Sequence, residues 1–275
     1  MEDQELKELK ELKTQLVEKA SKLLTKLKDQ EENQKVIKIK ESNVTKSVKE
    51  KLPEEYNKLS VCSKEVSGIA FKNIDRKWIH DNIYKYTTSL ISESLNVDVE
   101  LIVKLECDDK SEVCDLACNF KDLHQCYMFE VDSWYKFVIR KKNFSLLTSG
   151  IFQYNERNLV RRRLLNKLKD TNYISYEECL DKHGGILIHV HSPRSIAREY
   201  LTCQWVIAFT KRCWQLENHF NIDVTETEFA ERNNVLLANF VRKNTTKEEL
   251  TDSWSKLCFA IDLYESEEQV NTGSS

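Results

Sequence analysis

The clearest pattern of apolar and polar positions lies between residues 152 and 224. Residues 152–168 place apolar side chains three, four and seven positions apart, which predicts an amphipathic helix with one face on a core. Residues 185–191 and 200–209 are rich in β-branched and aromatic side chains, and residues 213–224 alternate apolar with polar side chains. These segments predict consecutive antiparallel strands. A helix followed by short strands in a meander indicates an α+β fold, with helices on one face of a sheet.

A similar order of elements is expected earlier in the chain. Residues 54–66 suit a short helix, and Gly68 can take the positive φ at which the chain turns into a strand at residues 69–71. Further strands are expected at 83–88, 96–106 and 112–120, whereas residues 129–147 fit a helix, a strand or a bridge between domains. We therefore expect two α+β units, at residues 53–140 and 150–265.

The C-terminal part predicts two more helices. Residues 228–241 suit a helix with Phe229, Val235, Leu236 and Phe240 inward. Thr246 and Glu249 have the spacing of a capping box, which predicts the start of a last helix. One face of that helix is expected to carry Leu250, Trp254, Leu257, Cys258 and Ile261. The polar residues 266–275 are expected to form a disordered tail.

The first 52 residues contain no glycine and no proline. Leu9, Leu16 and Leu23 recur every seven residues among lysines and glutamates, which is typical of a coiled coil. Lysines close to this seam disfavour a homodimer and leave room for a chosen partner. The three leucines are therefore candidate partner-binding residues; the alternative is a solvated charged helix or a partly disordered tail.

Composition narrows the classes of function. Charged residues make up 32% of the 275 residues, but the net charge is only −3, which argues against a general polyanion binder. No apolar run is long enough to cross a membrane, and the charged N-terminus does not resemble a secretory signal. Nine cysteines, an odd number, indicate reduced thiols in a cytosolic or nuclear protein. Only five glycines weigh against a nucleotide enzyme with a phosphate-cradling loop.

Two groups of residues could bind a metal ion. Structural zinc sites use two close ligand pairs. The gap from Cys114 to Cys118 fits one pair, whereas the gap from His124 to Cys126 is too tight, and cysteine is also a common small core residue. The first group therefore consists of Cys107, Cys114, Cys118 and Cys126, with His124. The second group is His183, His189 and His191, which are more simply interpreted as satisfied or surface histidines beside an apolar strand.

Nucleophilic cysteine chemistry is not expected either. Cys203 and Cys213 are predicted to lie in apolar strands, where burial makes a thiol inert. We therefore expect no catalytic residue, no resident metal and no cofactor, and a protein that is not an enzyme.

A basic face is predicted on the helix at residues 152–168. Arg161, Arg162 and Arg163 lie beside further cations there, and they are candidate partner-binding residues. Such a face can bind acidic protein segments, because the planar guanidinium of arginine can bind both oxygens of a carboxylate. It can also simply be solvated. A weak contact with DNA phosphates is the alternative, and no groove-reading motif accompanies the patch.

Three segments carry a resemblance to a known family. They are the helix-to-strand turn at 59–71, the basic helix 152–168 followed by a short strand at 173–176, and the strand at 205–209. In this layout they resemble the tandem-RWD subunits of the inner kinetochore, and most closely the centromere protein P family. An RWD domain consists of a helix, a four-stranded antiparallel meander and trailing helices.

The resemblance implies a structural subunit of the constitutive centromere-associated network, in the nucleus at the centromere, that serves chromosome segregation. It implies a heterodimer with a centromere protein O-like subunit, which then docks subunits like centromere proteins Q and U. RWD domains are similar to ubiquitin-conjugating enzymes, but the nearest string here, His191-Ser192-Pro193, lacks the asparagine of their His-Pro-Asn element. The alternatives are another tandem-RWD kinetochore subunit, such as centromere protein O, or a Cys/His thiol- or metal-dependent enzyme.

Overall fold

The computed structural model describes residues 54–106, 111–242 and 245–272, together with the helical residues Lys19 and Lys22. The chain divides into two compact units, Met1–Pro53 and Glu54–Ser275. Leu9, Leu16 and Leu23, and with them the expected coiled coil, lie outside the described residues. All the elements named below belong to the second unit.

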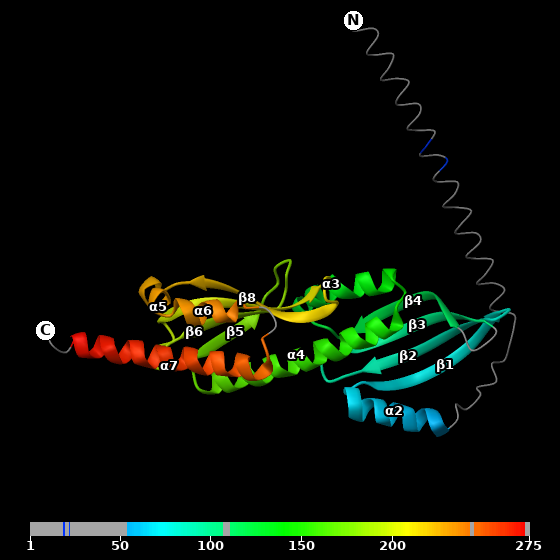
Figure 1. The fold of residues 1–275 in the computed structure, drawn as a ribbon, viewed down its shortest axis with the longest axis horizontal. Helices are drawn as coiled ribbons and strands as arrows, with labels where there is room; N and C mark the ends of the chain where they lie inside the picture. The colour runs from blue at the N-terminus through cyan, green and yellow to red at the C-terminus, as the bar shows by residue number, and fades with distance from the viewer. Residues whose placement is uncertain (1–18, 20–21, 23–53, 107–110, 243–244, 273–275) are drawn as a thin grey trace, which may run out of the picture. The chain divides into compact units, whose positions relative to one another are not determined.

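Two four-stranded antiparallel sheets form the centre of this unit, and in each the strands follow one another in chain order (Figure 1). The first sheet consists of β1 (Ala70–His80), β2 (Ile83–Ile91), β3 (Asn96–Leu105) and β4 (Ser111–Lys121). The second consists of β5 (Ile174–Glu178), β6 (Ile186–His191), β7 (Glu199–Thr210) and β8 (Gln215–Val224). The strands predicted from the sequence are therefore confirmed as two meanders.

Six helices accompany these sheets in the described part of the chain. Helix α2 (Glu54–Ser67) precedes the first sheet, and α3 (Gln125–Arg140) and α4 (Phe144–Asp170) lie between the two sheets in sequence. Helices α5 (Thr227–Arg232), α6 (Asn234–Phe240) and α7 (Lys247–Thr272) follow the second sheet. The α+β class is confirmed, and none of the described helices is long and apolar enough to span a bilayer.

Alternation along β6 and β7 gives the second sheet one apolar face. In the second sheet, Ile188 pairs with Cys203, and both are buried, whereas their neighbours Leu187 and His189 are only partly buried on the other face. An antiparallel sheet with one covered face and one solvated face has this pattern. Helices α4 and α7 contribute to the core on the covered face.

Helix α4 belongs to two hydrophobic cores. Its first half packs Leu147, Ile151 and Tyr154 with the first sheet and with α3. Its second half packs Leu164 and Leu168 with the second sheet and with α7. Because one helix serves both sheets, the domain limits 53–140 and 150–265 stay predictions.

Helix α4 begins earlier than the sequence pattern predicts. Residues 144–151 extend it by two turns, and the side chain of Asn143 caps it by accepting a hydrogen bond from the backbone N of Leu146 at 2.8 Å. Gly150 lies against Trp134 of α3, and a Cβ there would be 2.8 Å from ring atom Cζ3 of Trp134. Residues 129–147, for which the sequence allowed a helix, a strand or a bridge, are thus most of α3, a short turn and the start of α4.

The predicted turn at Gly68 and the predicted capping box before the last helix are both confirmed. Gly68 has φ +67° where α2 turns into β1. Before α7, the backbone N of Glu249 donates to Thr246 Oγ1 at 3.1 Å, and the backbone N of Thr246 donates to the Glu249 carboxylate at 2.8 Å. These two bonds are the reciprocal pair of a capping box, and they satisfy backbone donors that a helix start leaves unpaired.

The helix expected at residues 228–241 is instead two helices that meet at Asn233. The break shifts the helical phase. Val235, expected to face inward, is therefore 74% exposed, and Leu237 is buried in its place, while Phe229 and Phe240 lie in the core as predicted.

The disordered tail predicted from residue 266 is wrong for the residues that the structure describes, because α7 continues to Thr272. The hydroxyl of Tyr200 donates to the buried Glu265 carboxylate at 3.2 Å, and Arg198 donates to Glu268 Oε1 at 2.7 Å. Polar residues stay helical here because strand β7 and the loop before it supply partners for them.

We predict that ending the chain after Tyr264 lowers the free energy of unfolding by at least about 2 kcal/mol, because it removes the charge-assisted bonds of Glu265 and Glu268. Ending it after Thr272 should change this free energy by less than about 0.5 kcal/mol. Urea unfolding followed by circular dichroism measures both. Equal stability of the two truncated chains would contradict the tertiary role of the end of α7.

Candidate functional site

A buried ion pair joins α3 to α4. The guanidinium of Arg161 binds the carboxylate of Glu130 through two nitrogens, with Nη1–Oε1 at 2.6 Å and Nη2–Oε2 at 2.9 Å. Both side chains are at most 1% exposed. A bidentate pair of this kind is among the strongest charge-assisted interactions available to a protein.

Neighbouring groups complete the hydrogen bonding of both charges. Glu130 also accepts from the Tyr154 hydroxyl at 2.6 Å and from the backbone N of Ile207 at 2.7 Å. Arg161 also donates to Asn158 Oδ1 at 3.0 Å and to the carbonyl oxygen of Trp205 at 3.2 Å. We call Glu130, Tyr154, Asn158 and Arg161, with the β7 backbone they bind, the buried ion-pair network.

The surroundings of this network hold Arg161 charged and Tyr154 protonated. Burial opposes the charged form of Arg161, but the paired Glu130 carboxylate outweighs burial and raises the pKa of the guanidinium. Burial and the same carboxylate hold the pKa of Tyr154 well above its ordinary value, so its hydroxyl stays a donor. With every partner satisfied and no solvent access, the network is suited to holding elements in register.

The interpretation of Arg161 as part of an exposed basic face is therefore wrong. Arg162 and Arg163 are exposed, as expected, but Arg161 is buried. Residue 161 lies three positions before Leu164 and four before Leu165, on the apolar side of the helix, and this spacing was the signal that sequence reasoning missed. A partner or DNA can reach only the remaining cations of this helix.

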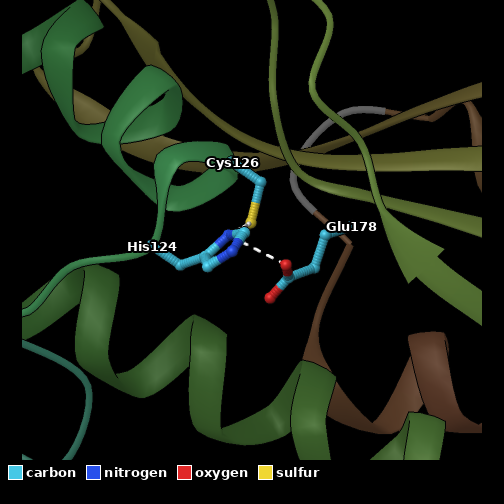
Figure 2. Close-up of side chains that lie close together, drawn as sticks. All are labelled: His124, Cys126 and Glu178. Carbon is cyan, nitrogen blue, oxygen red and sulfur yellow. Dashed lines mark hydrogen bonds and ion pairs between the residues drawn. The ribbon is translucent and has the colours of Figure 1, made fainter.

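A second cluster brings three chemically different side chains together (Figure 2). His124 Nδ1 lies 2.9 Å from Glu178 Oε2 and 3.4 Å from Cys126 Sγ. One potential ligand atom from each residue lies within 4.8 Å of the other two. We call His124, Cys126 and Glu178 the His-Cys-Glu cluster.

Local backbone structure sets the positions of this cluster. His124 is the N-cap of α3, with φ −62° and ψ 150°, and this extended conformation turns its side chain toward Cys126 in the first turn. Glu178 is the last residue of β5 and pairs with Ile186 on the covered face of the second sheet. The sequence prediction judged the His124–Cys126 gap too tight for zinc, and it did not connect either residue with Glu178.

The loop between β5 and β6 is hydrogen-bonded to the backbone of Cys126. The backbone N of Gly185 donates to the Cys126 carbonyl oxygen at 3.3 Å. Gly184 has φ +68°, and a Cβ there would lie 2.2 Å from the same oxygen, so this approach requires glycine. Burial, followed by the charges of Glu178 and Glu130, raises the pKa of the Cys126 thiol to about 11, so the free thiol stays protonated.

The other predicted metal ligands are not brought together in the described residues. Cys114 and Cys118 lie on β4 outside the His-Cys-Glu cluster, and Cys107 is not described. His189 pairs with Glu199, with Nδ1–Oε2 at 2.9 Å, and the buried His191 places Nδ1 3.1 Å from the carbonyl oxygen of Ser192. No set of potential metal ligands among the described residues includes His183, His189 or His191.

The two cysteines predicted to be inert have different environments. Cys203 is buried on β7, and burial raises its pKa to about 12. Cys213 is not in a strand: it lies in the turn between β7 and β8 and is exposed. The alternation that suggested a strand from residue 213 begins only at Gln215.

Comparison with known proteins gives no family assignment. No protein-family model matches this sequence, and no curated protein matches it.

We predict that Arg161→Met lowers the free energy of unfolding by about 3–5 kcal/mol, because it leaves the buried Glu130 charge without its partner. Arg162→Met on the same helix is the matched control and should change it by less than about 0.5 kcal/mol. Chemical denaturation of both variants measures the difference. Similar losses in the two variants would argue against the buried pair.

We also predict that a thiol reagent under native conditions labels Cys213 rapidly and leaves Cys203 unlabelled. The reason is that Cys203 is shielded and its raised pKa keeps it protonated at neutral pH. Peptide mass spectrometry after timed alkylation measures both sites, with urea-unfolded protein as the control in which both react. Equal native labelling rates would contradict the burial of Cys203.

Proposed function

We propose that this chain is a non-catalytic structural subunit of the inner kinetochore, built from two RWD-like units. The observation that carries this proposal is the order of the elements. Helix α2 precedes the β1–β4 meander and α3 follows it, and helix α4 precedes the β5–β8 meander and α5, α6 and α7 follow it. Helix, four-stranded meander and helix, repeated in one chain, is the layout of tandem-RWD kinetochore subunits.

The proposed partner is a second RWD protein of the centromere protein O type, with subunits like centromere proteins Q and U docking on the pair. Apolar side chains exposed on the chain support a protein partner. On α7, Phe259 is 62% exposed and Leu263, one turn later, is 48% exposed. At the end of β1, Trp78 is 63% exposed. Large apolar side chains on a surface are typical of binding sites when they gather in patches.

The proposed assembly places the chain in the nucleus, at centromeres, where it would support chromosome segregation. Leu9, Leu16 and Leu23 are proposed to contact the partner through a coiled coil. Arg162 and Arg163 are proposed to meet an acidic protein segment. DNA is the weaker alternative for these arginines, because the burial of Arg161 leaves fewer cations on this helix.

The test is co-expression of the full chain with a centromere protein O-type subunit, followed by size-exclusion chromatography with light scattering. We expect a one-to-one complex, and poor solubility or aggregation of this chain alone. A stable, monodisperse monomer that does not bind the partner would contradict the proposal.

We predict that replacing Phe259 and Leu263 together by glutamate weakens this complex by about tenfold or more, because charges would enter an apolar interface. The matched control is Val61→Glu on α2, which adds a charge at another exposed apolar position, 56% exposed, and should leave the affinity unchanged. Titration by fluorescence anisotropy measures both. Unchanged affinity in the double variant would remove α7 from the interface.

A further inference from the structure

In the His-Cys-Glu cluster, one nitrogen atom lies close to two other polar groups, which a simple ion pair does not explain. Nδ1 of His124 lies near both the Glu178 carboxylate and the Cys126 sulfur. A neutral imidazole nitrogen carries at most one proton, and a proton directed to the carboxylate is not directed to the sulfur. An ion at the centre of the three groups would engage all of them at once.

We propose that His124, Cys126 and Glu178 form a zinc site. Zinc binds imidazole nitrogen and carboxylate oxygen at about 2.0–2.2 Å and thiolate sulfur at about 2.3 Å, in a tetrahedron. Ligand atoms at these distances are roughly 3.3–3.6 Å apart. The His124 Nδ1–Cys126 Sγ separation of 3.4 Å lies in this range, the Nδ1–Oε2 separation of 2.9 Å is shorter than it, and the three ligand atoms lie within 4.8 Å of one another, so small side-chain shifts would bring them to the distances of a loaded site.

Charge also favours a divalent cation. When zinc binds, Cys126 releases its thiol proton to solvent, and the thiolate and the Glu178 carboxylate together balance the two positive charges of the ion. Nitrogen, sulfur and oxygen donors in one set suit zinc better than the hard cations magnesium and calcium, which take oxygen ligands.

The site is accessible yet held in place. Cys126 is fully buried, whereas the side chains of His124 and Glu178 are 52% and 43% exposed, so an ion can enter from solvent and a water molecule can fill the fourth position. The bond between Gly185 N and Cys126 O already fixes the β5–β6 loop against the start of α3. The ion would thus connect the start of α3 to the last residue of β5 in the second sheet. This structural role does not depend on the proposed kinetochore function.

The test is a cobalt titration of the full-length protein after metal removal with a chelator. Cobalt(II) reports its ligands by absorption. We expect one equivalent to give the ligand-field bands of a tetrahedral site and a thiolate-to-cobalt charge-transfer band, and zinc to displace it. We also expect zinc to raise the melting temperature of the wild-type chain.

The variants His124→Ala and Glu178→Gln change half-exposed side chains, so the fold should survive, as circular dichroism will check. Each should weaken zinc binding, measured by competition with a chromophoric chelator, by about a hundredfold or more, because each removes a direct ligand. Cys126→Ser should abolish the charge-transfer band. His189→Ala is the matched control, since His189 pairs with Glu199 at the same 2.9 Å distance without a cysteine, and it should bind zinc like the wild type.

Absence of the charge-transfer band in the wild type would overturn the proposal, because it would leave the cluster as an ion pair above a core cysteine. Undiminished zinc binding in both His124→Ala and Glu178→Gln would overturn it as well, because the ion would then be held elsewhere.

Discussion

The arrangement of α3, α4 and the second sheet depends on the salt bridge between Glu130 and Arg161. Its two charges come from α3 and α4, and its remaining hydrogen bonds come from Tyr154 and Asn158 of α4 and from the backbone of β7. Two charges without solvent are tolerated only when nearly every donor and acceptor has a partner. A shift of any of these elements would leave a charge unpaired, so the network specifies how helices and sheet fit together.

Helix α4 extends this constraint over its whole length, about 40 Å for its 27 residues. Its apolar residues contribute to both cores, and its polar residues bind the backbone of the β2–β3 turn and of β8. Asn155 accepts from the backbone N of Ser94 at 3.0 Å, and Gln153 accepts from the backbone N of Leu216 at 2.9 Å. Contacts of this kind tie both meanders to the same helix.

The His-Cys-Glu cluster depends on the same arrangement. His124 and Cys126 open α3, and Glu178 ends β5, so the three meet only because the buried ion-pair network and the Gly184–Gly185 turn bring α3 against the second sheet. Glu130 lies one turn beyond Cys126 on α3, and its charge also acts on the Cys126 thiol. The buried ion-pair network and the His-Cys-Glu cluster are therefore neighbours with different exposure to solvent.

Local sequence determined the elements, because hydrophobic period and capping chemistry act over a few residues. The β-branched and aromatic side chains at 185–191 and 200–209, the Gly68 turn and the Thr246–Glu249 capping box all predicted what the structure contains. Tertiary structure decided the rest. The hydrophobic period could not show that Arg161 pairs with a buried carboxylate, or that Glu265 and Glu268 bind residues on and before β7. It also could not show that Glu178 lies beside His124 and Cys126. Each of these contacts joins residues far apart in the chain. The free energy of a charged or polar side chain depends on what surrounds it, and only the folded chain supplies those surroundings.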